Sequence, residues 1–322
     1  MSKYQQGSPA GKDTAPYHVP VMLQQSIDGL NIRPSGIYVD VTFGGGGHSR
    51  GILSRLGEGG RLYGFDQDSD AAMQATSVMA SPGEGTPSGC FTFVHSNFRY
   101  LSNWMRYYGV GQIDGLLADL GVSSHHLDEG DRGFSFRHDA PLDMRMNRDS
   151  AVTAADIVND RDEECLADIL HLYGELPGAR RIAAAIVRAR AVRRITTTSE
   201  LATVAVPLMA RGKKDLPRLF QALRIEVNRE MEALRDMLSA AVALLAPGGR
   251  LVVITYHSLE DRIVKNVMKT GNAEGKVNKD VFGRIALPLH PIGGKPVTPS
   301  AAEMAINPRS RSAKLRVAEK VA

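Results

Sequence analysis

The sequence predicts an α/β protein with a mostly parallel, doubly wound sheet that is interrupted by an all-helical insertion. Strand-like and helix-like patterns alternate in both end regions of the chain, whereas residues 150–210 contain helical patterns only. A buried-strand pattern also runs directly into four consecutive glycines within residues 36–49. With 322 residues, of which 43% are hydrophobic, the chain has ample material for one large or two ordinary domains.

The first strand carries the most informative motif, GIYVDVTFGGGGHS at residues 36–49. Glycines between a strand and a helix let backbone N–H groups approach a bound ligand closely, and the helix N-terminus adds a positive dipole end. The segment therefore predicts a nucleotide-type cofactor site. Alternatively, the glycines form only a flexible turn, since glycine runs are common in loops.

The second strand, RLYGFD, ends in Asp66, 22 residues beyond Gly44. A carboxylate at this place usually binds the ribose hydroxyls of an adenosine, as in NAD or S-adenosylmethionine. An NAD loop needs glycine at its first, third and sixth positions, and the sixth position here is Ser49. The pattern favours S-adenosylmethionine. An NAD-dependent oxidoreductase remains the weaker alternative, which calorimetry with S-adenosylhomocysteine and NADH would separate.

The remaining elements follow in order. The patterns predict a helix near 69–80, a strand at 90–98, a helix near 99–108, a strand at 113–124, a long amphipathic helix over 216–245 and a strand at 250–256. These elements divide the chain into a disordered tail (1–17), a first sheet part (18–127), a helical insertion (128–214) that would recognise RNA, and a second sheet part (215–322).

Composition narrows the class of protein. A net charge of +4 and a pI near 9.0 permit a nucleic-acid partner. Cys90 and Cys165 have no metal-binding spacing, which indicates a reducing cytosol and no structural zinc. No apolar run approaches the roughly 20 residues of a membrane span, and the first 17 residues contain no hydrophobic signal core. A cytoplasmic enzyme without a membrane partner is predicted.

Basic residues gather in two places. On the predicted helix after Gly178, five arginines fall off the apolar face formed by Ile182 and Ile186. They are Arg180, Arg181, Arg188, Arg190 and Arg194. Such a face suits phosphate contacts, although a charged helix face is more often simply solvated. In the tail, four basic residues alternate with apolar ones and predict an edge strand with one basic face. They are Arg309, Arg311, Lys314 and Arg316.

Taken together, several blocks resemble the signatures of the RsmH (MraW) family. They are HVPVML (18–23), VDVTFGGGGHS (39–49), GFDQD (64–68), DLGVSS (119–124), GFSF (133–136), PLDMRM (141–146), LFQALRIEVNRE (219–230), ITYHSLEDRIVK (254–265) and NPRSRSAKLRVAE (307–319). The resemblance implies a class I, Rossmann-like methyltransferase fold with an inserted helical domain. It also implies S-adenosylmethionine as cofactor and methylation of the exocyclic N4 of a cytidine in the decoding region (P site) of 16S rRNA in the small ribosomal subunit. DNA is not expected as a partner, and an oligomer is compatible with the resemblance.

Matching motifs carry the family's cofactor contacts to a defined set of positions. They are Gly46, Gly47, His48, Asp66, Phe98 and Asp119. The family usually continues DLGVSS with Pro-Gln, and here His125 and His126 follow, so that His126 stands in place of the contacting glutamine. The glycine-rich segment 271–294 departs from the family as well.

The chemistry gives Asp119 a second predicted role. The lone pair of a cytosine amino group is delocalised into the ring, so it attacks a methyl sulfonium well only when acceptors hold its hydrogens and the methyl lies in line. Such positioning is worth about 7 to 11 kcal/mol. At the tip of the fourth strand, Asp119 is the best acceptor and the predicted catalytic residue. Alternatively, it binds the cofactor or caps a loop.

The target base must leave its stack, and an aromatic surface can offset that cost. Phe134, Phe136 and Tyr256 are predicted to supply it, although each phenylalanine is equally well explained as a buried anchor. His257 is predicted as a substrate contact together with Arg181, Arg188 and Arg190. Ser258 with Asp261 matches a capping box. A non-catalytic assembly factor remains an alternative, but its glycine loop or ribose carboxylate should be damaged, and both are intact.

Overall fold

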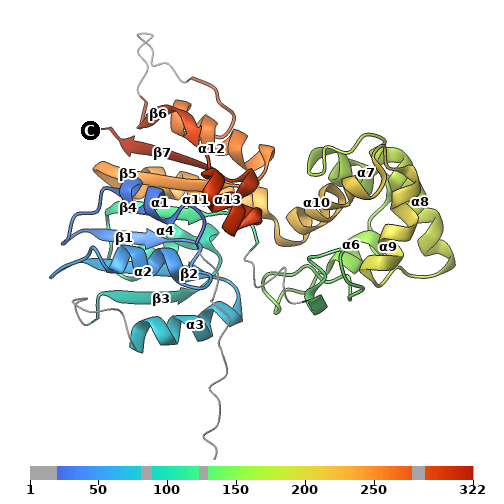
Figure 1. The fold of residues 1–322 in the computed structure, drawn as a ribbon, viewed down its shortest axis with the longest axis horizontal. Helices are drawn as coiled ribbons and strands as arrows, with labels where there is room; N and C mark the ends of the chain where they lie inside the picture. Colours follow the sequence, from blue (N-terminus) through green and yellow to red (C-terminus); the bar gives the residue numbers. More distant parts are fainter. Residues whose placement is uncertain (1–19, 81–88, 123–129, 278–286, 322) are drawn as a thin grey trace, which may run out of the picture.

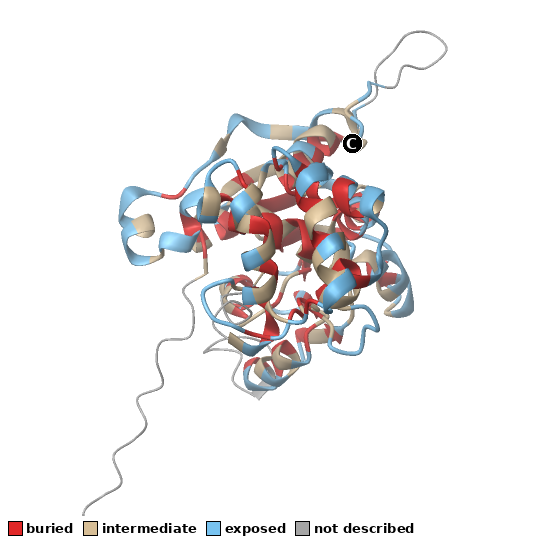
Figure 2. Ribbon diagram, turned by 90° about the vertical axis from the view of Figure 1, so that its right-hand side faces the viewer, coloured by how far each residue is buried: buried red, intermediate tan, exposed pale blue. Residues whose placement is uncertain are grey.

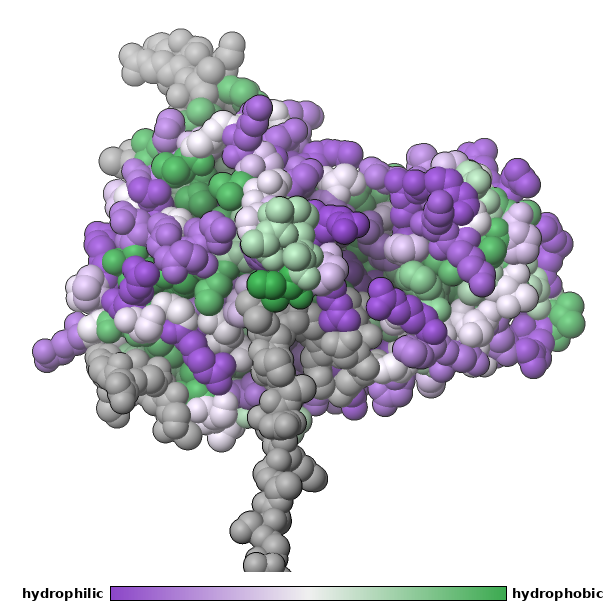
Figure 3. Space-filling view, viewed as in Figure 1, coloured by the Kyte–Doolittle hydropathy of each residue, from purple (hydrophilic) through white to green (hydrophobic). Residues whose placement is uncertain are grey.

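The computed structural model describes residues 20–80, 89–122, 130–277 and 287–321. The chain forms two lobes, one built on a sheet and one made of helices (Figure 1). On the face seen in Figure 3 the surface of both lobes is predominantly hydrophilic. No helix within the described ranges is long and apolar enough to cross a membrane.

The first lobe contains a seven-stranded sheet in the order β3-β2-β1-β4-β5-β7-β6. Its strands are β1 Ile37–Asp40, β2 Arg61–Asp66, β3 Phe91–His95, β4 Ile113–Asp119, β5 Leu245–Thr255, β6 Leu289–Val297 and β7 Lys314–Lys320. The neighbours from β3 to β5 are parallel, whereas β7 is antiparallel to both β5 and β6. The carboxyl ends of β1, β2 and β4 therefore meet at one edge of the sheet, where open α/β sheets bind their ligands.

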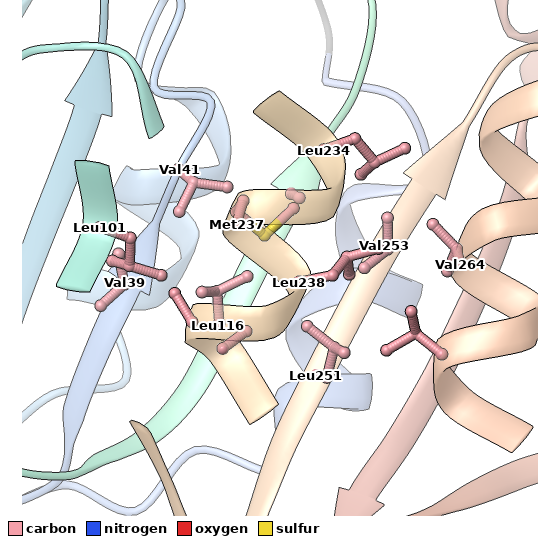
Figure 4. Close-up of a cluster of buried hydrophobic side chains, with 14 of the residues drawn as sticks. Val39, Val41, Leu101, Leu116, Leu234, Met237, Leu238, Leu251, Val253 and Val264 are labelled. Carbon is pink, nitrogen blue, oxygen red and sulfur yellow. The ribbon is translucent and has the colours of Figure 1, made fainter. Parts of the chain in front are cut away.

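Helices cover both faces of this sheet, which confirms the doubly wound prediction (Figure 1). On one face pack α1 Leu23–Leu30, α2 Gly47–Leu53 and α3 Ser69–Ala80. On the other pack the short 3-10 helix η1 Phe98–Tyr100, α4 Leu101–Tyr107, α11 Glu230–Leu244 and α12 Ser258–Thr270. In Figure 4, Met237 and Leu238 of α11 lie among side chains of β1, β4 and β5. Buried residues follow the sheet and the inner faces of the helices (Figure 2).

The second lobe has its own apolar core. It contains η2 Gly130–Arg132, α6 Ala154–Asp160, α7 Glu163–Leu172, α8 Ala179–Val192, α9 Thr198–Ala205, η3 Val206–Leu208, η4 Gly212–Asp215 and the first part of α10 Leu216–Asn228. Capping boxes at Thr153 and Thr197 begin α6 and α9. Leu223 belongs to this core and Ile225 to the sheet's core, so the change of core falls within α10, later than the predicted boundary at 214/215.

The prediction of one long helix over 216–245 is wrong. Arg229 has a left-handed backbone (φ 50) and separates α10 from α11. The contacts on either side explain the break. Glu230 turns back to bind the Arg224 guanidinium at 2.7 and 2.9 Å. The Asn228 side chain donates to the Met144 carbonyl and accepts from the Met146 N–H. These tertiary contacts offset the cost of the left-handed residue.

The predicted strand in the tail is confirmed as β7 for Lys314 and Arg316, but its predicted edge position is wrong. β7 lies between β5 and β6 and is therefore an interior strand, and β6 forms the edge. Lys314 and Arg316 are not a free basic face, because both pair with Asp261 of α12. The other two residues of the group, Arg309 and Arg311, lie in the 3-10 helix η5 Pro308–Ser312, which follows α13 Ala301–Ile306.

Candidate functional site

A cavity of about 820 Å³ lies at the carboxyl ends of the parallel strands, between the two lobes. Its walls come from the glycine loop after β1, the ends of β2 and β4, the loop at 133–136, the first turns of α10 and the helix η5. Of the predicted site residues it brings together a large set. They are Gly47, His48, Asp66, Phe98, Asp119, Phe134, Phe136, Tyr256 and His257.

The glycine loop divides into an open and a packed half. Gly44 and Gly45 line the cavity, and a Cβ added at Gly44 would meet only the Thr42 carbonyl at 4.0 Å. Gly46 is not among the lining residues. It begins α2 with φ 73, and a Cβ there would come within 2.8 Å of the Phe43 ring. A Cβ on Gly47 would come within 2.2 Å of Pro20. Gly46 and Gly47 are thus required by packing, while Gly44 and Gly45 leave room for a ligand.

Asp66 ties the glycine loop to the end of β2. Its Oδ2 accepts from the Gly44 N–H at 2.8 Å, and its Oδ1 accepts from the Asp68 N–H at 2.9 Å. The carboxylate lines the cavity beside these contacts, and the half-buried Phe98 ring lies in the same wall. A carboxylate for a diol and an aromatic ring for a base fit the adenosine part of S-adenosylmethionine, and the side-chain-free loop backbone leaves room for the rest of the molecule.

Asp119 ends β4 and is held on three sides. Its backbone N–H donates to Thr42 Oγ1 at 2.6 Å, and its Oδ1 accepts from the Tyr256 hydroxyl at 2.8 Å. His48 Nδ1 lies 3.8 Å from Oδ2. Burial raises the pKa of Asp119 to about 6, an effect that nearby Asp40 and Glu260 reinforce and that His48 and Tyr256 reduce. At neutral pH the group is therefore a carboxylate with strong acceptor character.

A second carboxylate, Asp40 at the end of β1, is fully buried. Burial raises the pKa of Asp40, opposed by His48 and by the hydrogen bonds from Ser49 and Thr42. Ser49 Oγ donates to Asp40 Oδ2 at 2.7 Å. His48 is also buried, with Nε2 3.1 Å from the Val21 carbonyl oxygen. The His48 imidazole and the Asp40 carboxylate thus belong to one buried network beside Asp119.

The aromatic residues divide by burial. Phe134 is buried in the core of the helical lobe, with the Arg132 guanidinium 5.5 Å from its ring centroid, which favours its role as an anchor. Phe136 is 38% exposed and packs edge-on against Phe220, so its ring is the more accessible of the two. Burial and Asp119 raise the pKa of Tyr256 well above its ordinary value, so that its phenol remains a donor.

His257 caps α12, and the predicted capping box of Ser258 with Asp261 is wrong. His257 Nδ1 accepts from the Glu260 N–H, and the Glu260 carboxylate accepts from the Tyr256 N–H. Burial disfavours the ionised Glu260, but His257, the Tyr256 N–H and Arg224 outweigh it and lower the pKa of Glu260. Asp261 instead pairs with Arg316. The sequence pointed to Ser258 because serine is a common cap and histidine an uncommon one, and the actual cap lies one residue earlier.

Sequence reasoning missed the wall supplied by α10. Gln221 and Arg224 line the cavity, and Arg224 is nearly buried in its ion pair with Glu230. The block LFQALRIEVNRE contains both residues of this ion pair. Arg224 and Glu230 are six residues apart, however, and residues of one helix are neighbours at spacings of three or four, so the sequence did not indicate the pair. Arg309 and Ser312 of η5 line the same cavity.

The arginines of α8 lie elsewhere. α8 is on the side of the helical lobe away from the sheet (Figure 1), and none of the described residues that line the cavity belongs to it. Arg181 and Arg188 are exposed. Arg190 Nη1 donates to the Val158 carbonyl at 2.7 Å, and Arg194 pairs with Asp160, so both have structural contacts. The predicted contact His126 lies outside the described residues.

Comparison with known proteins agrees with this geometry. The family model of MraW methylases matches residues 15–321. A protein of Bacteroides thetaiotaomicron named ribosomal RNA small subunit methyltransferase H is 60% identical over 96% of this chain and 99% of its own length. Proteins of the same name from Parabacteroides distasonis and Flavobacterium psychrophilum are 59% and 50% identical, over 95% and 93% of this chain and 98% and 100% of their own. With this match along nearly its whole length, the chain belongs to the MraW methylase family.

Proposed function

We propose that this protein methylates the exocyclic N4 of a cytidine in the 16S rRNA of the small ribosomal subunit, with S-adenosylmethionine as methyl donor. The observation that carries the proposal is the position of Asp119, whose carboxylate faces the same cavity as the glycine loop and Asp66. The relatives' name, ribosomal RNA small subunit methyltransferase H, supports the choice of substrate.

In this proposal Asp66 holds the ribose hydroxyls, the Gly44–Gly45 backbone lies along the methionine part, and Phe98 contacts the adenine. When bound, S-adenosylmethionine supplies a methyl group activated by its sulfonium. The cavity, about 820 Å³, extends beyond this half to Phe136, Gln221 and Arg224. That second half provides the space for a base that has left its stack.

Asp119 then accepts hydrogen bonds from the amino hydrogens of the base. Tyr256 donates to Oδ1 of the carboxylate, so in this proposal Oδ2, which lies 3.8 Å from His48 Nδ1, is the oxygen that accepts from the base. An acceptor draws electron density onto the amino nitrogen and localises its lone pair, and it takes the proton that the nitrogen must lose after methylation.

The exposed guanidiniums of Arg181 and Arg188 are proposed to contact RNA phosphates away from the cavity. A substrate as large as a ribosomal subunit can contact both the cavity and the outer side of the helical lobe. Arg190 is left out of this set, because its guanidinium is bound to the Val158 carbonyl.

The proposal is tested by incubating the purified protein with labelled S-adenosylmethionine and small subunits from cells that lack the corresponding gene. The RNA is then digested to nucleosides and analysed by mass spectrometry. N4-methylcytidine is expected with the wild-type protein and should be absent with Asp66→Ala. A methyl group on another atom, or no transfer to naked RNA, free subunits or whole ribosomes, would contradict the proposal.

A further inference from the structure

The buried network beside Asp119 contains one imidazole, His48, and a second carboxylate, Asp40. His48, from the first turn of α2, is 5% exposed, and Asp40, from β1, is fully buried. Asp119, from β4, has a side chain that is 22% exposed on the cavity. The electrostatic effect of His48 lowers the pKa of each carboxylate.

The contacts of the ring decide where its hydrogens lie. His48 Nε2 is 3.1 Å from the Val21 carbonyl oxygen, which can only accept, so Nε2 carries a hydrogen. The other nitrogen, Nδ1, faces Asp119 Oδ2 at 3.8 Å. In a neutral ring its lone pair would point at the carboxylate and repel it. With a hydrogen on Nδ1 the same contact is attractive.

We infer that His48 is a positioning residue for the reaction, which keeps the Asp119 carboxylate oriented toward the substrate amine through the contact between His48 Nδ1 and Asp119 Oδ2, and that its side chain is not a cofactor ligand. This inference rests on the proposed function. The nearby Asp40 accepts from Ser49 Oγ and the Thr42 N–H, which hold its carboxylate in place. Tyr256 completes the set with its hydrogen bond to Asp119 Oδ1.

The charged groups that face Asp119 from the packed elements act in opposite directions. Asp40 from β1 and Glu260 from α12 disfavour its ionisation, whereas His48 from α2 and the Tyr256 phenol favour it. Removal of His48 leaves the effect of these two carboxylates on the pKa of Asp119 opposed mainly by the Tyr256 phenol. The Asp119 carboxylate should then take up a proton at a higher pH than in the wild type.

The test replaces His48 by glutamine, which can still donate to the Val21 carbonyl but carries no charge. The acid limb of the kcat/KM profile should move upward by about 1 to 3 pH units, with activity recovering at alkaline pH. The affinity for S-adenosylhomocysteine should change less than about threefold, since the side chain does not hold the cofactor. His290→Gln, at an exposed position on β6, is the matched control and should leave the limb in place.

A second readout does not depend on any RNA substrate. Titration of the Asp119 carboxyl carbon by NMR in the free protein, assigned with Asp119→Asn, should show the same upward shift in His48→Gln. A shifted titration in a protein that methylates no RNA would reject the proposed function and, with it, the role of His48 in the reaction, and would keep only the electrostatic coupling of His48 to Asp119. The inference would be overturned if neither the acid limb of kcat/KM nor the titration of Asp119 moved in His48→Gln. It would also be overturned if that variant lost S-adenosylhomocysteine affinity tenfold while the acid limb stayed in place. If His48→Gln does not fold, the neutral and smaller His48→Asn carries both measurements.

Discussion

At the scale of single residues, the site depends on carboxylates with different environments at the ends of neighbouring strands. Asp66 accepts two backbone N–H groups and braces the glycine loop. Asp119 is bound by a phenol and has a raised pKa because it is buried. One residue type therefore serves two purposes, with hydrogen bonding deciding the first and burial the second.

Asp66→Ala should lower the affinity for S-adenosylhomocysteine at least tenfold. The variant loses hydrogen bonds to the ribose, each worth about 1.5 to 3 kcal/mol for a charged acceptor, and also releases the Gly44 N–H. Calorimetry measures the affinity, and circular dichroism checks the fold. Asp66→Asn, which keeps an acceptor oxygen, should lose less. Equal affinities for the wild type and the alanine variant would show that the carboxylate does not bind the ribose.

Asp119→Asn should abolish most turnover and yet stabilise the fold at pH 8. The raised pKa means that the folded state holds a proton more tightly than the unfolded chain, so wild-type stability falls as pH rises from about 4 to about 6. A difference between 3.8 and about 6 corresponds to at most ~3 kcal/mol above that range. Asparagine does not ionise, so the variant does not lose stability as pH rises, and its amide oxygen can still accept the hydrogen bond from the Tyr256 hydroxyl.

Urea unfolding at pH 4 and pH 8 measures this difference, with kcat and cofactor affinity determined on the same samples. The gain in stability should be small at pH 4 and largest at pH 8. A variant that loses as much cofactor affinity as kcat would make Asp119 a cofactor ligand rather than the acceptor. A variant less stable than the wild type at pH 8 would refute the effect of burial.

At the scale of elements, α8 distinguishes arginines that look equivalent in the sequence. Arg181 and Arg188 are exposed, while Arg190 is bound to Val158 in the neighbouring α6. A helical period places a side chain on a face, but it cannot show what the next helix offers to that face. Only the two exposed residues remain candidates for RNA binding among these three.

Replacing Arg181 and Arg188 together by glutamine should raise KM for the small subunit and flatten its salt dependence. Each lost phosphate contact reduces the slope of log K against log salt by about 0.7 to 0.9. Cofactor affinity and stability should stay unchanged. Arg190→Gln is the matched variant and should show the reverse, with a loss of roughly 1 kcal/mol of stability and an unchanged salt slope. A double variant with the wild-type slope would leave this face solvated and direct attention to Arg309 and Arg311.

At the scale of the whole molecule, a buried ion pair joins the lobes. Arg132 Nη1 lies 2.7 Å from Asp68 Oδ2, and both side chains are 5% exposed. The same guanidinium donates to the Arg145 and Met146 carbonyls. Because Asp68 follows β2 and Arg132 belongs to the helical part, this contact sets how the second wall of the cavity faces the glycine loop.

Arg132→Met should therefore destabilise the protein by about 3 to 5 kcal/mol, since it takes the Arg132 guanidinium away from the buried Asp68 carboxylate. The midpoint of urea unfolding reports this loss. Combining it with Asp68→Leu, which removes the second charge, should recover a substantial part. A single variant within about 1 kcal/mol of the wild type would mean that the pair does not hold the lobes together.

The sequence by itself determined the alternating pattern of the sheet lobe, the helical insertion, and the glycine loop and Asp66 as parts of one cavity wall. These features rest on local signals, namely apolar periodicity, a glycine run and a carboxylate at a set distance along the chain. Tertiary structure alone decided the break at Arg229, the interior place of β7 and the wall from α10. Most of these depend on partners more than a turn or a strand away, such as Glu230 for Arg224 or Asp261 for Arg316. Pairing of that kind leaves no period in the sequence, because the energy comes from burial and charge between segments that only the fold brings together.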